Sequence, residues 1–269
     1  MSLIIETLDG QIYDLEAIGV KVSSLVIDSL SPRIESETMD GRDGFIDTGI
    51  TFEGRSLRAS FYLSETNRQR FVENRNRIFS LFRSKQYFYL IEKHLPDRRW
   101  KVRTNASFQM NKISFYMGTF NVEFIAPLPY AESRGTTLCP TYTEGYFQVS
   151  TSEPVQYIFN QNKFSVWNEG DIAVDPCVHP LSITFNGASN QLAIKNLTNG
   201  TEWSFKDSSL ESDSIILEGI RSYKNSKDYS IFGQTNRKLI SLEQGWNEFE
   251  ISGSTSPFEV SFDFRFYYI

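Results

Sequence analysis

Residues 35–63 read ESETMDGRDGFIDTGITFEGRSLRASFYL, and this stretch decides how the first half of the chain is interpreted. It sets four glycines among aspartates and arginines: Gly41, Gly44, Gly49 and Gly54 beside Asp40, Asp43, Asp47, Arg42 and Arg55. Such a stretch is either a loop that holds an ion or a phosphate, or the turn of a β-hairpin. Apolar residues occupy every second position over 57–63, which is the period of a strand.

The pattern of residues 40–44, DGRDG, fits the hairpin better than a binding loop. A calcium loop needs an oxygen ligand at its third position, where this sequence has Arg42. A glycine clamp for nucleic acid needs flanking helices, whereas strands flank this segment. Glycine supplies the positive φ of tight turns, and aspartate side chains accept hydrogen bonds from the turn backbone. We therefore predict a hairpin in which Arg42 and Arg55 pair with nearby acids and have no catalytic role.

Strand signals surround this hairpin on both sides. IIETLDGQIYDL, residues 4–15, predicts a first hairpin that turns at Asp9-Gly10. An extended stretch follows over residues 20–30. Further strands are expected in 86–93, 100–110 and 118–126, before Pro127 and Pro129 stop the ladder because proline cannot donate to it.

Residues 64–84 have a different character and predict one long helix. The segment lacks Gly and Pro, and its apolar residues recur at helical spacing: Phe71, Val72, Ile78, Phe79 and Phe82. Ser64 or Thr66 is expected to cap its start, and Lys85 suits its end.

The second half of the chain predicts a β domain without a long helix. Short strand patterns separated by turn residues occupy 180–187, 191–205, 212–220 and 236–252, and Asn199-Gly200 marks a turn. The last pattern is the clearest, because bulky apolar residues fill every second position from Phe258 to Tyr268. Regular short strands of this kind indicate a sandwich or a barrel. The polar stretch 132–145 suggests a boundary, with domains 1–135 and 136–269.

The charge of the chain is unevenly distributed around a net value of −6. Residues 64–103 hold 11 Lys and Arg against 4 Asp and Glu, whereas residues 1–63 hold 5 against 11 and residues 135–269 hold 9 against 16. The basic segment is either a solvated helix face or a docking surface for an acidic partner. Nucleic acid is disfavoured as that partner because the whole chain is acidic and no recognition motif accompanies the segment.

The remaining compositional features favour a globular chain without export or metal chemistry. The start of the chain does not resemble a signal peptide, and no apolar window is long enough to span a membrane. Cys139 and Cys177 are expected to be free thiols, although a disulfide joining them is the alternative. His94 and His179 are too few and too isolated for a histidine metal site.

No motif for chemistry is present, so we assign no catalytic, cofactor-binding or metal-binding residue. The sequence contains no Walker loop, GxSxG elbow, HExxH pair or CxxC pair. Exposed aromatic side chains of a β domain sometimes bind sugars, and four residues are candidates for glycan contact: Trp167, Tyr223, Tyr229 and Trp246. The alternative is that they pack in the core or in turns. Trp203 is expected to be buried, and Trp246 to lie in a turn that covers the edge of the sandwich.

The order of these segments resembles the distal tail proteins of phages with long, non-contractile tails and of their prophages, the siphophage tail family. The resemblance covers essentially the whole chain. In the first domain it rests on the Asp9-Gly10 hairpin, on DGRDG followed by EGRSLRASF, and on the exit FNVEFIAPLPYAES. In the second it rests on NEGDIAVDPCVHPLSI, IKNLTNGTEWSF and LEQGWNEFEISG.

The resemblance implies a mainly β protein with one long helix. Its first domain would be a β-barrel-like domain that assembles as a homo-hexameric ring, and its second a galectin-like β-sandwich. The ring would join the tail tube protein to the tail hub, a tail-associated lysin-like protein, and to receptor-binding or baseplate proteins. The protein would lie at the virion tail tip after assembly in the bacterial host cytoplasm, with no cofactor and no catalysis.

Charge suggests where copies could meet in such a ring. The basic segment 64–103 follows the acidic segment 1–63, so opposite faces of neighbouring copies could attract. We take four arginines as the candidate assembly interface: Arg68, Arg70, Arg75 and Arg77. The alternative function is a carbohydrate-binding module that recognises host cell-wall polysaccharide through residues 140–269. An enzyme would rest only on the abundance of carboxylates.

Overall fold

The computed structural model describes residues 2–82, 85–139 and 154–269 of the chain. Contacts divide the chain into two compact units, Met1–Glu132 together with Ile269 as unit 1 and Ser133–Tyr268 as unit 2. The polar stretch that suggested a domain boundary lies partly outside the described residues, since 140–153 are not among them.

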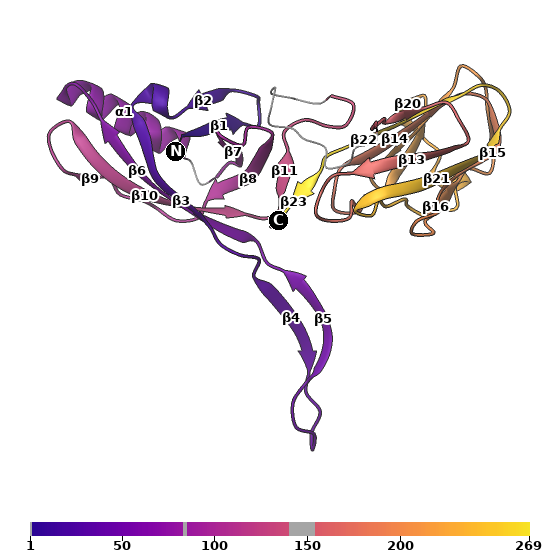
Figure 1. Ribbon diagram of the computed structural model, residues 1–269, viewed down its shortest axis with the longest axis horizontal. Coiled ribbons are helices and arrows are strands. Elements are labelled where there is room, and N and C mark those ends of the chain that lie inside the picture. Colours follow the sequence, from indigo (N-terminus) through magenta and orange to yellow (C-terminus); the bar gives the residue numbers. More distant parts are fainter. Residues whose placement is uncertain (1, 83–84, 140–153) are drawn as a thin grey trace. The chain divides into compact units, whose positions relative to one another are not determined.

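Unit 1 is built around a sheet with the strand order β2-β1-β7-β8-β10-β6-β3, with β9 paired to β10 (Figure 1). Its strands are β1 (Leu3–Thr7), β2 (Ile12–Asp14), β3 (Val20–Ile27), β6 (Arg55–Ser64), β7 (Phe88–Glu92), β8 (Arg98–Thr104), β9 (Asn111–Lys112) and β10 (Met117–Ala126). A short 3₁₀ turn, η1 (Glu16–Ile18), precedes β3, and β11 (Ala131–Ser133) lies at the boundary between the units. Each expected strand of the first half is present, but the one predicted over 100–110 is displaced: β8 ends at Thr104, and residues 105–110 are not in a strand.

The hairpin at Asp9-Gly10 is confirmed by antiparallel pairing of β1 with β2. The amide N–H of Gly10 donates to the carbonyl of Thr7 at 3.0 Å, and Gly10 has a φ of +84°. Glycine adopts this conformation without the steric cost that other residues carry.

The core of unit 1 forms between the sheet and the helix α1 (Arg68–Leu81). Leu57, Ala59, Phe61 and Leu63 are buried, as the period-two pattern predicted. The ring of Phe82, just after the helix, lies 5.8 Å from Phe61 and 5.5 Å from Phe124. These aromatic contacts attach the end of the helix to β6 and β10.

The helix is shorter than the sequence predicted. β6 continues through Ser64, which lies opposite Met117 of β10. Ser64, one of the two expected N-caps, is therefore part of the sheet. Asn67 is the N-cap instead, and its side chain accepts a hydrogen bond from the amide of Arg70 at 2.9 Å. At the other end Phe82 leaves the helical conformation to enter the core, so the helix ends before Lys85.

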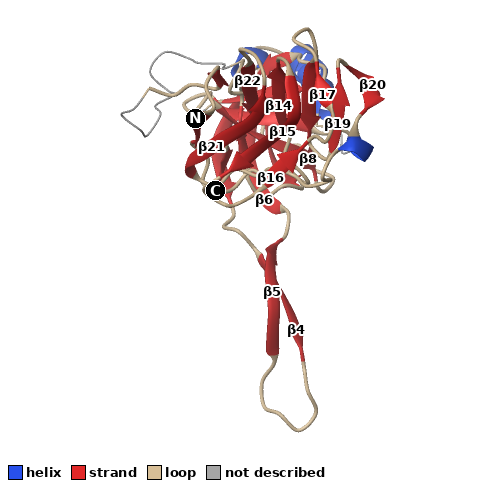
Figure 2. Cartoon of the chain, turned by 90° about the vertical axis from the view of Figure 1, so that its right-hand side faces the viewer, coloured by secondary structure: helices blue, strands red, loops and turns tan. Residues whose placement is uncertain are grey.

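β4 (Pro32–Glu37) and β5 (Ile46–Phe52) form a separate two-stranded sheet between β3 and β6. We call residues 32–53 the arm. Figures 1 and 2 show the arm extending away from the sheet of unit 1. Gly41 and Gly44 in its turn have φ values of +81° and +85°, so the hairpin interpretation of DGRDG is confirmed.

The described residues of unit 2 form two sheets. The first has the order β12-β22-β14-β18-β19-β20, and the second has the order β13-β21-β15-β16 with β17 paired to β15. The first sheet contains β12 (Ile158–Phe159), β14 (Leu181–Asn186), β18 (Ser214–Glu218), β19 (Arg221–Lys224), β20 (Ser226–Ser230) and β22 (Glu259–Phe264). The second contains β13 (Lys163–Asn168), β15 (Ser189–Asn196), β16 (Glu202–Ser204), β17 (Ser208–Ser209) and β21 (Gly245–Ser254). The 3₁₀ turn η2 (Phe232–Gln234) follows β20.

Aromatic side chains join the two sheets of unit 2 into a sandwich. Phe262 of the first sheet lies 4.8 Å from Phe249 and 5.8 Å from Phe164 of the second, measured between ring centroids. The last apolar run is not one strand as predicted. β22 ends at Phe264, where Arg265 turns its guanidinium to the carbonyls of 133–135, and the chain resumes as β23 (Tyr267–Tyr268).

Within the described residues α1 is the only α-helix, and strands account for most of the regular structure. The predicted mainly β fold, with one long helix in the first half and a β-sandwich in the second, is confirmed.

Candidate assembly surfaces

The arm has one apolar face and one polar face. Pro32 lies opposite Phe52 and Ile34 opposite Ile50, and directly opposed residues of a ribbon share a face. Ile34, Ile50 and Phe52 are 53%, 57% and 44% exposed. The other face carries polar pairs, among them Arg33, whose Nε donates to Oγ1 of Thr51 at 3.2 Å. The arm therefore presents an uncovered apolar stripe to solvent.

The base of the arm is fixed by Arg55, the first residue of β6. Its Nε donates to the carbonyl of Asp28, and its Nη1 donates to the carbonyl of Pro129 at 3.3 Å. The guanidinium also lies 5.0 Å from the ring of Trp100. Burial lowers the pKa of Arg55, and the carboxylate of Asp28 opposes that shift. Arg55 thus positions the arm, rather than only pairing with an acid as predicted.

A second apolar surface lies on the turn between β9 and β10. Ile113, Phe115 and Tyr116 are 66%, 76% and 46% exposed. The turn is ordered, because the amides of Ile113 and Ser114 both donate to the carbonyl of Met117. We call residues 113–116 the β9–β10 tip.

The four candidate arginines occupy α1 but do not form one patch. At 100° per residue, Arg68 and Arg75 lie on one side of the buried stripe of Phe71 and Ile78, and Arg70 and Arg77 lie on the other. Arg75 donates from Nε and Nη2 to Asn76, and Arg77 lies 5.9 Å from the ring of Tyr13.

The structure brings together only two of the four aromatic candidates in unit 2. Trp167 of β13 lies directly opposite Trp246 of β21, with ring centroids 5.1 Å apart and both rings half-buried. Trp246 is therefore in a strand, not in the edge turn that we predicted, because the ladder with β13 begins at Gly245. Tyr223 is only 5% exposed, which leaves it no surface for a glycan, and Tyr229 is exposed but belongs to the other sheet.

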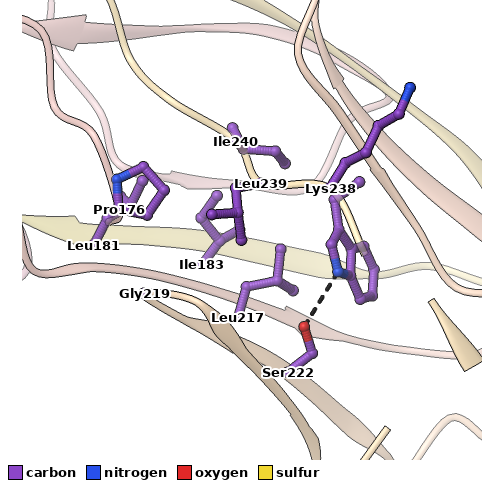
Figure 3. Close-up of a pocket in the computed structure, with 10 residues that line it drawn as sticks. Pro176, Leu181, Ile183, Leu217, Gly219, Ser222, Lys238, Leu239 and Ile240 are labelled. Atoms are coloured by element: carbon purple, nitrogen blue, oxygen red, sulfur yellow. Dashed lines mark hydrogen bonds between the residues drawn. The ribbon is translucent and has the colours of Figure 1, made fainter. Parts of the chain in front are cut away.

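A small pocket in unit 2 is lined by apolar side chains (Figure 3). Leu181, Ile183, Leu217 and Ile240 gather around it, and Nε1 of Trp203 donates to Oγ of Ser222 at 3.2 Å beside it. Its volume of about 10 Å³ holds one water molecule at most. Trp203 is buried, as predicted, and the pocket is a packing gap of the core rather than a ligand site.

The described residues contain no group of three or more His, Cys, Asp or Glu side chains that could hold a metal ion. Cys139 and Cys177 are both free thiols, as predicted, and both are exposed. No helix in the described part of the chain is long and apolar enough to cross a membrane.

The sequence of the first unit matches a known family. Residues 8–126 match the phage tail protein RIFT-related domain of siphophage tails. This match lies within the first unit and covers less than half of the chain. This match and the fold together confirm the resemblance to siphophage tail proteins that the sequence indicated, and they support a structural role in a phage tail.

Solved structures extend the similarity to the whole chain. The Dit protein of phage SPP1, described as a paradigm of the hub adsorption apparatus in phages that infect Gram-positive bacteria, has the same fold at a TM-score of 0.70 and 12% identity. That match covers 98% of this chain and 99% of the SPP1 protein. The baseplate of phage p2 in its activated conformation with strontium matches at a TM-score of 0.49 and 9% identity, covering 98% and 97% of the two chains. No curated protein sequence matches the chain.

The sequence did not single out the arm face or the β9–β10 tip as functional. A signal was present, because Ile34, Ile50 and Phe52 sit at strand spacing on both sides of DGRDG. That signal predicts an apolar face but does not predict that the face stays uncovered.

Proposed function

We propose that the chain is a structural protein of the siphophage tail tip that assembles as a ring of six copies. The ring joins the end of the tail tube to the baseplate hub and the host-adsorption device. The phage tail family of residues 8–126 and the SPP1 Dit fold over nearly the whole chain support this proposal. Its neighbours in the virion are the tail tube protein, a tail hub or lysin-like protein and the receptor-binding or baseplate proteins. Assembly takes place in the host cytoplasm, and no catalytic step is assigned.

The observation that carries the proposal is the uncovered arm. An isolated two-stranded ribbon has marginal stability in water, and this one exposes Ile34, Ile50 and Phe52 on a single face. Exposed apolar patches on otherwise polar chains mark interaction sites. A ring needs a heterologous interface that closes on itself, and a protruding arm supplies one half of it.

Light scattering of the purified full chain after size exclusion, at low and moderate salt, tests the ring. The expected result is a mass of six copies, or a salt-dependent mixture that reaches six, with rings visible by negative-stain electron microscopy. Antibody labelling of intact virions should mark the end of the tail. A strict monomer at every concentration contradicts spontaneous ring formation, and labelling elsewhere on the virion contradicts the tail-tip role.

A second candidate function is glycan binding by unit 2, favoured by one observation. Trp167 and Trp246 form a half-exposed aromatic pair, and Nε1 of Trp167 donates to Oε2 of Glu169 at 2.7 Å. Aromatic rings with a nearby carboxylate suit the stacking of a sugar ring. A glycan array with the full chain tests this role: a saturable signal that is lost in Trp246→Ala supports it, and an empty array removes it.

A further inference from the structure

We propose that the arm of one copy docks onto the opposite end of unit 1 in a second copy of this chain. The receiving surface comprises the start of α1 and the β9–β10 tip. This inference rests on the proposed self-assembly and names the two surfaces that meet in it.

The two surfaces lie at opposite ends of the same strand pair. The arm joins β6 at Arg55, which pairs with Ala126 of β10. The other end of β6 is Ser64, which pairs with Met117 beside the β9–β10 tip. Ten strand residues separate these ends by about 30 Å. Figure 1 shows β9 and the arm at the two ends of β10 and β6, so the arm does not reach the receiving surface of its own copy.

The charges of the two surfaces are complementary. The arm, residues 32–53, holds six Asp and Glu against two Arg. Helix α1 holds four Arg against Glu73, and Arg68 and Arg70 are exposed in its first turn, one on each side of the buried stripe. Opposite charges of this kind steer association and fix the register of two partners.

Other charged groups at the receiving end do not reverse its sign. Lys112, on β9, adds a further exposed positive charge. Glu65 precedes the helix, but its Oε1 accepts a hydrogen bond from Nδ2 of Asn74 in the same copy. The start of α1 also lies close to the tip, because the amide of Glu65 donates to the carbonyl of Tyr116 at 3.0 Å. Basic and apolar groups therefore sit side by side.

The apolar parts of the two surfaces are complementary as well. The arm offers the face of Ile34, Ile50 and Phe52, with Phe45 59% exposed in its turn. The receiving end offers Ile113 and Phe115, the latter 76% exposed. Burial of these side chains against each other makes a favourable contribution to the free energy of association, and salt does not screen this contribution. The contact joins two different surfaces, so each copy uses both and the chain of contacts can close into a ring.

Photo-crosslinking of the full chain tests the contact directly. p-Benzoylphenylalanine in place of Phe45 should yield crosslinked dimers whose peptides join position 45 to residues 65–70 or 110–117. The matched control carries the same group in place of Ile220, which is 56% exposed in unit 2, and should give no such link. Crosslinks from position 45 to other regions of the second copy overturn the inference.

A charge exchange provides the second measurement. R68E/R70E should weaken self-association about tenfold at low salt, and D40K/D43K should do the same. The four substitutions combined should restore it, which a folding defect would not do. K206E/K238E, at exposed positions of unit 2, is the control and should leave association unchanged.

If the wild-type chain associates and none of these variants changes its self-association, the inference fails while the proposed ring stands. If the wild-type chain stays monomeric, self-association itself fails and the inference with it.

Discussion

Ile34 of β4 lies directly opposite Ile50 of β5, and both side chains are more than half exposed on the same face of the arm. In a folded chain such a pair is normally covered by a helix or a second sheet. Here the described residues supply no cover, so the stripe is available to another chain.

Replacing Ile50 with Lys should reduce self-association without lowering the melting temperature. The side chain is exposed, so its removal leaves no cavity, whereas a charge in a docked apolar face carries a desolvation cost. Light scattering and calorimetry measure the two quantities. Ile220→Lys is the matched control, because Ile220 is 56% exposed against 57% for Ile50. Equal loss of association in both variants would contradict a specific role of the arm.

Arg99 holds two carboxylates inside unit 1, and its removal should destabilise the fold strongly. Its Nη1 lies 3.0 Å from Oε1 of Glu6, and its Nη2 lies 2.7 Å from Oε1 of Glu132, with the guanidinium 3.6 Å from the ring of Tyr89. Arg99→Ala leaves both carboxylates without this cation. We expect the free energy of unfolding to fall by about 3–5 kcal/mol. Urea unfolding measures the loss.

Two comparison variants separate the ion network from simple loss of side-chain volume. Adding Glu132→Gln to Arg99→Ala should recover part of the stability, because one of the two carboxylates that lost this cation is made neutral. Lys101→Ala, at an exposed position of the same strand, should change stability little. No recovery in the double variant would indicate that packing on Tyr89, not charge, accounts for the effect.

Asn247 of β21 is fully buried, and every hydrogen-bonding position of its amide is satisfied. Oδ1 accepts from the amide of Glu243 at 2.8 Å and from Nδ2 of Asn196 at 2.9 Å, and Nδ2 donates to the carbonyls of Glu243 and Gly245. Asn247→Ala leaves several of these groups unpaired and should lower the free energy of unfolding by about 3 kcal/mol. Calorimetry should show a clear fall in the melting temperature, with Asn160→Ala, at an exposed position, as the unaffected control.

Asp213 should contribute stability at neutral pH that disappears in acid. Hydrogen bonds from Asn225, Lys224 and the amide of Leu210 hold the pKa of its carboxyl at about 2, below the ordinary 3.8. Because the folded pKa is lowered, this stability is present above about pH 4 and is lost as the pH falls through about 2. Asp213→Asn should therefore lower the free energy of unfolding by about 2 kcal/mol at pH 7 and by much less at pH 2.

Chemical denaturation of the wild type and of Asp213→Asn at pH 7, 4 and 2.5 measures how the free energy of unfolding depends on pH. Asp228→Asn, at an exposed position of β20, is the control and should follow the wild-type curve. A constant difference between Asp213→Asn and the wild type across this range would show that the lowered pKa is not the source of the stability.

Local sequence patterns were sufficient to predict most of the strands, the hairpin turns and the existence of the helix. These depend on neighbours in the chain: alternation over 57–63, glycines at 41 and 44, and the spacing of Phe71 and Ile78 each report a local conformation. The helix start was wrong by a few residues, because β10 pairs with Ser64 and extends β6 through the expected cap.

Which apolar faces are covered could not be predicted from these patterns and depends on tertiary packing. Leu57 and Ile50 sit in strand patterns of the same kind, yet Leu57 is completely buried and Ile50 is 57% exposed. Tyr223 and Tyr229 differ in the same way: both were candidates for glycan contact in the sequence, but Tyr223 is buried and Tyr229 is exposed. A period-two pattern shows which side chains share a face. Whether a helix or sheet lies over that face depends on residues far along the chain, and for the arm the described residues provide none.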